Sequence, residues 1–397
     1  MSVSSSFEPR RRELVLAALA LLGGCGGVDS GGTGTGASST YANGPITGFG
    51  SIIVNGVRYD DTSAAIDDDD GRVRSRADLK LGMRTEVLAS AITVNSGVSS
   101  ATADSIRVHS EIVGPLEAID SANARLTVLG QSVAVVATTV FDTALAGGLA
   151  ALVLGNVLEV YATLDIASGR YVAARIERRS NATAYKLRGV VTTLALAAKT
   201  LGIGGATIDW SGVAPSDPAS ALAPGQFVRV TLDTSAPVPG VWRATALSSG
   251  VLRQDDREVA EIEGRITEFT STTRFAVNGI PVDATAASLP NGGAGLAVGV
   301  LVEAHGSLRN GVLVASRVEL EAEGGGAAAF ELHGNIESAD PVTMRFVVRG
   351  VTVMWGANTV FEGGSAADIK PSTREVEVKG RLSADGSLIE ATSVHFA

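Results

Sequence analysis

The sequence predicts an all-β chain made of tandem repeats, and three observations carry that prediction. A glycine that opens each unit recurs at intervals of about 70–75 residues, a second glycine follows inside each unit, and a Leu-x-x-Gly pattern closes its middle part. Val, Ile and Thr alternate with polar residues between these markers, as in half-buried strands. The opening glycines are Gly44, Gly114, Gly189, Gly264 and Gly334, the second glycines are Gly56, Gly130, Gly205, Gly279 and Gly350, and the Leu-x-x-Gly glycines are Gly82, Gly155, Gly225 and Gly299.

The pattern is clearest in residues 264–319. Asn278 and Gly279 stand between two alternating runs, and Asn-Gly in this position favours a two-residue hairpin. Each unit has the order strand, strand, strand, a helical stretch of at most two turns, strand, strand. This order fits a five-stranded, OB-like barrel. The alternatives are a β-sandwich and a solenoid whose units share sheets.

The markers divide the chain into a leader, a tether and five units. Each unit is near the lower size limit for independent folding, so neighbouring units are expected to pack on each other as a semi-rigid string. The predicted segments are 1–24 (signal peptide), 25–43 (lipidated, flexible Gly/Ser/Thr tether), 44–113 (unit 1), 114–188 (unit 2), 189–263 (unit 3), 264–333 (unit 4) and 334–397 (unit 5).

The N-terminus has the layout of a bacterial lipoprotein signal. Three arginines at positions 10–12 precede an apolar run at 14–22, which is too short to span a bilayer. Leu22-Gly23-Gly24-Cys25 resembles a lipobox, and Cys25 is the only cysteine of the chain. The resemblance implies cleavage before Cys25 and acylation of its thiol and amine, which would anchor the protein stably in a membrane.

Two details of this leader bear on the export pathway and on the membrane to which the protein is sent. The pair Arg11 and Arg12 weakly resembles a twin-arginine signal, but nothing downstream indicates a cofactor, so general secretion is favoured. Residue 26 is Gly and not Asp, which by resemblance to enterobacterial lipoproteins favours the outer membrane over the inner membrane.

Composition narrows the classes of partner. The formal net charge is −10, and an acidic chain is a poor ligand for nucleic acid, whose binding depends on Lys and Arg. Aromatic residues make up 5% of the chain, so the cores are expected to be aliphatic. We therefore predict a non-enzymatic protein without a cofactor, whose partners are the membrane, through Cys25, and an envelope protein or glycan.

Unit 1 contains a run of four carboxylates, followed by Gly71. Clustered oxygen ligands can hold Ca²⁺, but the EF-hand spacing fails, since Ile66 and Ala77 would occupy its first and twelfth positions. A solvated loop is the favoured interpretation, and a weak Ca²⁺ site is the alternative. The candidate ligands are Asp67, Asp68, Asp69 and Asp70.

Residues of catalytic type do not form a recognisable motif. Glu86, Glu159 and Glu303 each lie four residues after a Leu-x-x-Gly glycine, where Arg229 and Val376 stand in units 3 and 5. Their recurrence in separate units argues for a structural role over glycan hydrolysis, which needs two carboxylates about one bond. Trp210 and Trp242 are expected in a barrel core and not at a sugar site. The four histidines, His109, His305, His333 and His395, show no zinc-binding spacing.

Several segments together resemble a family of small bacterial repeats known only as a domain of unknown function. They are the G-x-I/V opening, the core at 275–282, the L-x-x-G-x-x-V-E segment and the closing Ala315-Ser316-Arg317-Val318. The resemblance covers most of the chain after the leader and is clearest in unit 4. It implies tandem repeats behind a Gram-negative lipoprotein signal, and it implies no activity and no functional residues.

Overall fold

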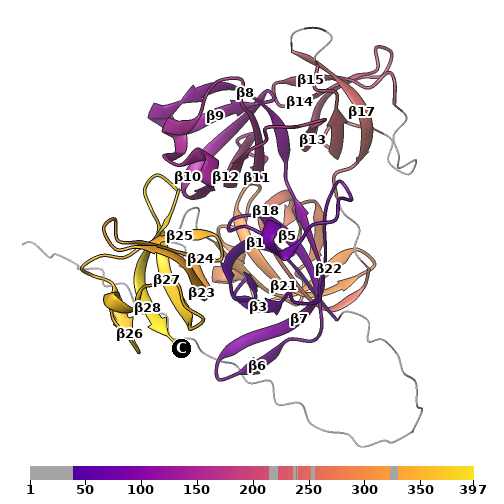
Figure 1. The fold of residues 1–397 in the computed structure, drawn as a ribbon. Coiled ribbons are helices and arrows are strands. Elements are labelled where there is room, and N and C mark those ends of the chain that lie inside the picture. Colours follow the sequence, from indigo (N-terminus) through magenta and orange to yellow (C-terminus); the bar gives the residue numbers. More distant parts are fainter. Residues whose placement is uncertain (1–38, 214–221, 236–237, 239, 252–254, 322–329) are drawn as a thin grey trace, which may run out of the picture.

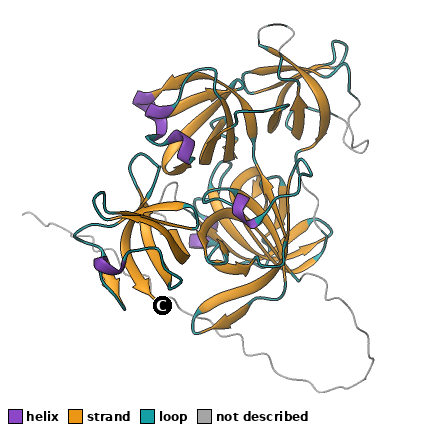
Figure 2. Ribbon diagram, viewed as in Figure 1, coloured by secondary structure: helices purple, strands orange, loops and turns teal. Residues whose placement is uncertain are grey.

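The computed structural model describes residues 39–213, 222–235, 238, 240–251, 255–321 and 330–397. These residues form small, repeated β-barrels whose only helices are short 3-10 turns, so the all-β prediction is confirmed (Figures 1 and 2). Within these ranges, no helix has both the length and the apolar character needed to cross a bilayer. The predicted signal peptide and Cys25 lie outside the described residues.

Five strands close each barrel in one order of pairing, which unit 4 illustrates. β18 (Arg257–Ser271) pairs with β19 (Arg274–Val277), and β19 pairs with β20 (Ile280–Asp283). β20 lies parallel to β22 (Val312–Leu320). β22 and β18 both pair with β21 (Leu301–Arg309), which closes the ring, and η5 (Pro290–Gly293) precedes β21.

The strands of the other units pair in the same order. Unit 1 has two additional strands, β4 and β6, and unit 5 has one, β26. The elements of unit 1 are β1 (Thr40–Phe49), β2 (Ile52–Val54), β3 (Val57–Asp60), β4 (Ala65–Asp68), η1 (Arg76–Asp78), β5 (Arg84–Ala89), β6 (Thr93–Asn95) and β7 (Val98–His109). Those of unit 5 are β23 (Phe330–Asp340), β24 (Arg345–Val348), β25 (Val351–Met354), β26 (Val360–Glu362), η6 (Ala366–Asp368), β27 (Glu375–Leu382) and β28 (Ile389–Phe396).

Units 2 and 3 form the second hydrogen-bonded sheet, separate from that of units 1, 4 and 5. Unit 2 consists of β8 (Ile112–Asp120), η2 (Ser121–Asn123), β9 (Arg125–Val128), β10 (Gln131–Phe141), η3 (Thr143–Leu145), η4 (Gly148–Ala151), β11 (Val157–Asp165) and β12 (Arg170–Arg178). Unit 3 consists of β13 (Tyr185–Ala195), β14 (Thr200–Ile203), β15 (Ala206–Asp209), β16 (Phe227–Leu232) and β17 (Val241–Ser249).

The first two glycine markers have a common physical reason. Asn278 has a φ of 51° in the predicted hairpin turn, and its amide Nδ2 donates to the Glu263 carbonyl at 3.1 Å. The turn thereby folds back over Gly264, where a Cβ would collide with the Asn278 side chain. Glycine opens the unit because only a residue without a Cβ admits this close approach.

The first strands begin earlier than the glycine markers suggested. β1 starts at Thr40, so residues 40–43 do not belong to the predicted tether. Residues 40–43 form a strand because they pair on both sides, with residues 86–89 of β5 and with residues 259–262 of β18. The opening strands of units 2 to 5 likewise begin before their glycines, so the predicted boundaries cut each of these strands.

The units form a cluster around unit 1, so the expected string is wrong (Figure 1). β1 runs parallel to β18 of unit 4 and, at its other end, parallel to β23 of unit 5. Units 1 and 5 share one apolar core, units 2 and 3 share another, and the core of unit 4 takes in Tyr41 of unit 1. Small barrels gain stability when the ends of their long strands pair with strands of a neighbouring barrel.

Candidate functional site

The outer face of unit 4 gathers ionisable side chains from three neighbouring strands. Period-2 alternation turns Ile262 and Ala304 into the barrel core, so Glu261 and His305 point outward. Register then makes them neighbours, since Glu261 of β18 lies opposite His305 of β21, and Glu303 of β21 lies opposite Glu319 of β22. The short distance between the strands brings these side chains into contact.

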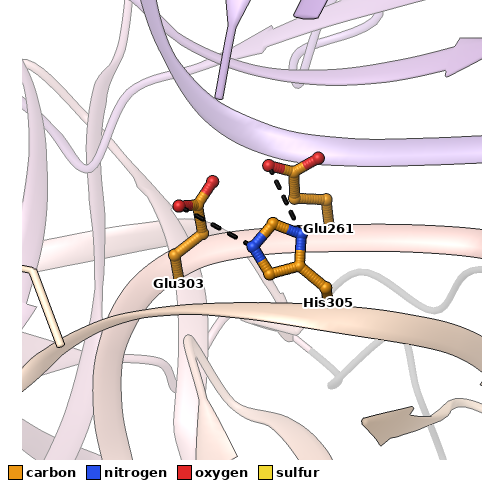
Figure 3. A group of neighbouring side chains, drawn as sticks. All are labelled: Glu261, Glu303 and His305. Atoms are coloured by element: carbon orange, nitrogen blue, oxygen red, sulfur yellow. Dashed lines mark ion pairs between the residues drawn. The ribbon is translucent and has the colours of Figure 1, made fainter. Parts of the chain in front are cut away.

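Three of these side chains converge on one point. His305 Nδ1 lies 3.7 Å from Glu261 Oε1, and His305 Nε2 lies 3.8 Å from Glu303 Oε2 (Figure 3). One ligand atom from each of the three residues lies within 4.8 Å of the other two. At the rim, the Arg317 guanidinium donates to His305 Nε2 at 3.0 Å. Two carboxylates and an imidazole in this arrangement are a plausible ligand set for a divalent metal ion.

Electrostatics make the two carboxyls share a proton. Burial, a hydrogen bond with Glu261 and the negative charge of Glu261 raise the pKa of Glu303 to about 9. Burial also raises the pKa of Glu261. Burial and the charge of Arg317 lower the pKa of His305 to about 4, so the imidazole is neutral near pH 7 and keeps a lone pair for a ligand.

This proton sharing predicts a pH-dependent stability in metal-free buffer. The unfolded chain loses the Glu303 proton near the ordinary value of 4.5, whereas the folded chain keeps it to about 9. The free energy of unfolding should therefore fall as the pH rises from about 4.5 to about 9, and Glu303→Gln should reduce this fall. Thermal unfolding followed by circular dichroism, in the presence of a chelator, measures it. Glu268→Gln, an exposed carboxyl of the same β18, should keep the wild-type slope.

Unit 5 carries a related group at nearly the same register positions. Glu331 of β23 stands at the same distance before its opening glycine as Glu261 does. Glu377 of β27 and Glu303 each follow the residue that pairs with the opening glycine. His333 Nε2 lies 2.6 Å from Glu331 Oε1, and these three side chains also approach within 4.8 Å. Here, however, cations compensate the carboxylates, since Glu331 pairs with Arg58 of unit 1 and Glu377 pairs with Lys379 at 2.8 Å.

The pairing of the opening strand with the fourth strand shows which residue occupies the position of the recurring glutamate in each unit. Glu86, Glu159 and Glu303 each follow the residue that pairs with the opening glycine. In unit 5 this position is Glu377 and not Val376, which the sequence offset had selected; Val376 pairs with Gly334 and is buried. In units 1 and 2 the glutamate is a structural acceptor, since Tyr41 Oη donates to Glu86 at 2.9 Å and Ser110 Oγ donates to Glu159 at 2.8 Å.

Each carboxylate of the acidic run of unit 1 faces a cation, and Asp69 and Asp70 share the same two cations. Asp67 lies 3.1 Å from Arg107, Asp68 lies 2.7 Å from Arg74, and Asp69 lies 2.7 Å from Lys186 of unit 3, while Asp70 pairs with Arg229 of unit 3. The favoured interpretation as a solvated loop is therefore wrong for Asp68 and Asp69, whose side chains are buried. With every carboxylate already facing a cation, the run clamps units 1 and 3 together, and the geometry does not favour Ca²⁺.

A small polar cavity lies where units 1 to 4 meet. Its volume is about 40 Å³, which is room for ordered water. Three buried atoms of its lining, Glu86 Oε2, His109 Nε2 and Glu111 Oε2, have no hydrogen-bond partner within the described part of the chain. Burial acts to raise the pKa of Glu111, but Arg188, His109 and Arg84 outweigh it, so that pKa lies below its usual range. The cavity is best explained as a hydrated junction between units.

The remaining candidates have structural positions. Trp210 and Trp242 are partly buried and pack against the core of units 2 and 3 without standing in it, and Trp242 packs edge-on to Tyr185 with 5.5 Å between ring centroids. His395 is exposed on β28, opposite Glu377. Cys25 lies outside the described residues.

Comparison with known proteins identifies a repeated domain. Three segments match one family model. It is described as a domain of unknown function (DUF5666), and the matches cover residues 113–177, 263–319 and 333–395. They lie in units 2, 4 and 5, and each begins at the last residue of the preceding unit. The chain matches no curated protein. Among solved structures, "drosophila Unr CSD456" aligns at 8% identity over 77% of this chain and 99% of that one, with a TM-score of 0.14.

Sequence reasoning missed the pairing of Glu261 with Glu303 and His305. The motif Glu-x-Glu-Gly at 261–264 and the segment Val-Glu-Ala-His at 302–305 both alternate with apolar residues. Pairing of the first strand with the fourth, which an OB-like order implies, would have placed these carboxylates on one outer face. No short-range spacing singles out His305, because the carboxylates around it come from two different strands.

Proposed function

We propose that this chain is a non-enzymatic, lipid-anchored protein of the bacterial cell envelope, made of five OB-like repeats, that presents their surfaces to a protein or glycan partner. The observation that carries this proposal is the way the units are locked together. Inter-unit strand pairing and the ion pairs of Asp69 and Arg58 hold separate barrels in fixed relative positions. A rigid cluster of binding modules behind a leader of the lipoprotein type suits a scaffold or receptor at a membrane.

Hydrolysis of glycans fits the geometry less well. A glycosidase holds its two carboxyls about 5–10 Å apart across a cleft. Glu261 and Glu303 instead share a hydrogen bond, which leaves no space for a sugar ring between them. The cavity at the junction of the units is only about 40 Å³. The proposal is therefore for binding and positioning, with the outer membrane favoured as the location.

Membrane fractionation with metabolic acyl labelling tests the anchor. We expect the wild-type protein to be labelled and to sediment with membranes, and Cys25→Ser to be unlabelled and absent from the membrane fraction. The physical reason is that stable attachment needs more than one acyl chain, and the processed Cys25 would carry them all. Absence of label from the wild-type protein would contradict the proposal. Partners of the labelled protein can then be captured by cross-linking in intact cells.

A further inference from the structure

We propose that Glu261, Glu303 and His305 bind a divalent first-row transition metal ion on the outer face of unit 4. Ligand atoms of the three residues already lie within 4.8 Å of one another. Two of the residues lie opposite each other on hydrogen-bonded strands, so the backbone holds their positions. This inference concerns one cluster of side chains and does not depend on the lipid anchor or on a macromolecular partner.

The chemistry of the donors selects the class of ion. A neutral imidazole nitrogen is a good ligand for Zn²⁺ and its first-row neighbours, whereas Ca²⁺ and Mg²⁺ prefer an all-oxygen set. Carboxylate oxygens complete the usual mixed set of zinc sites. Glu319 can supply a fourth ligand, because its Oε2 lies 3.9 Å from His305 Nε2 and its side chain is partly exposed. The remaining coordination positions would be open to water.

A buried hydroxyl of unit 1 on which the charge of Glu261 acts is a second observation. Tyr59 of unit 1 is completely buried, and its Oη has no hydrogen-bond partner within the described residues. It lies close enough to Glu261 for that negative charge, after burial, to raise the pKa of the phenol. A water molecule bound to the ion, or a carboxylate reoriented by it, would give this hydroxyl the partner that it lacks.

Charge balance distinguishes this cluster from its counterpart in unit 5. In unit 5, Arg58 and Lys379 neutralise Glu331 and Glu377, so binding of a dication would add little electrostatic stabilisation. Within the described part of the chain, Glu261 and Glu303 form no ion pair with a buried Lys or Arg, and the nearby Arg317 is about half exposed. A dication would displace the proton that the two carboxyls share and would be attracted to both carboxylates.

Arg317 is the competitor of the ion. It donates to His305 Nε2, and its positive charge opposes binding of a cation. Its side chain is 51% exposed and also lies 3.3 Å from Glu319 Oε1, so it can turn toward solvent without opening the core. Removal of Arg317 should therefore strengthen metal binding, whereas removal of a ligand should weaken it.

Isothermal titration calorimetry with Zn²⁺ tests the proposal on the full chain, after purification in a chelator and dialysis. We expect wild type to bind one ion with an affinity that Glu303→Gln and His305→Asn each weaken by at least about tenfold. Arg317→Ala should strengthen binding. Glu268→Gln, on the same strand but exposed, and Glu377→Gln, the counterpart in unit 5, should bind as wild type does.

The variants distinguish metal binding at the unit 4 cluster from metal binding elsewhere on the chain. Failure of wild type to bind Zn²⁺, equal affinity in Glu303→Gln, or loss of binding in Glu377→Gln would each overturn the proposal. Circular dichroism in chelator checks that every variant folds. If a ligand variant does not fold, Arg317→Ala remains decisive, because it removes only a half-exposed side chain. Weaker binding by this variant would overturn the proposal as well.

Discussion

Asp69→Asn should destabilise the protein by about 3–5 kcal/mol, the cost of removing one partner from a buried ion pair. The Asp69 and Lys186 side chains are 4% and 5% exposed, and Arg229 also approaches the same carboxylate at 3.3 Å. The substitution leaves Lys186 and Arg229 with Asp70 as their remaining counter-charge, and the Asp70 side chain is 34% exposed and lies 3.9 Å from Lys186. Urea unfolding measures the loss, and hydrogen exchange should show faster opening of β13 and β16, which carry Lys186 and Arg229.

The same acidic run provides the control. Asp67 and Arg107 form an ion pair whose side chains are 40% and 44% exposed, so Asp67→Asn should cost less than about 1 kcal/mol. Equal destabilisation by the two substitutions would mean that the contact between units 1 and 3 is not the cause.

The pH dependence of this clamp has a defined sign. Burial acts to raise the pKa of Asp69, but Lys186 and Arg229 outweigh it and hold the pKa below its ordinary value. Its stabilising contribution is therefore present above the ordinary carboxyl pKa and is lost as the pH falls through the folded value.

Gly306→Ala should destabilise unit 4 by about 1–3 kcal/mol, near the upper end of that range. Gly306 follows His305 at a register shift between β21 and β22. A Cβ at this position would collide with the Val314 carbonyl oxygen and lie 2.8 Å from Ala315 Cα. These are backbone atoms of a paired strand, which cannot move aside as a side chain can, so the two strands would have to separate.

Hydrogen exchange resolved by segment is the appropriate measurement, because several barrels need not unfold in one step. Exchange should accelerate in β21 and β22 of the Gly306→Ala protein. Gly356→Ala is the matched control, since a Cβ there meets no atom within 4 Å and its φ is not positive, and it should change stability by no more than about 0.5 kcal/mol. Acceleration confined to other units would contradict the explanation.

The strands and hairpins could be predicted because their signals are local. Asn278 and Gly279 mark a turn, and alternation of apolar and polar residues marks the strands around it. In units 1, 2, 4 and 5 the opening glycine is approached closely by a residue of the following hairpin turn, a relation contained within one unit, whereas a Cβ at Gly189 of unit 3 would meet the Tyr171 hydroxyl of unit 2. The short helical stretch was predicted for the same reason, and 3-10 turns such as η1 and η6 occupy it.

The association of the units and the candidate site depend on contacts that no local pattern reports. Asp69 looked solvated because its partner Lys186 lies 117 residues away in the sequence. Glu261 and Glu303 meet only through the register of β18 with β21, and an error of one residue in register moves a side chain to the other face. That sensitivity also explains why Val376 was selected in place of Glu377.

Pairing of β1 with β23 has a consequence for the time course of folding. Gly48 lies beside Glu331, so β1 cannot complete its hydrogen bonds until the chain has been synthesised as far as β23. Contacts between such distant residues slow folding and leave apolar surface exposed meanwhile. The N-terminal unit should accordingly be the one that most needs protection by chaperones, even though it is made first.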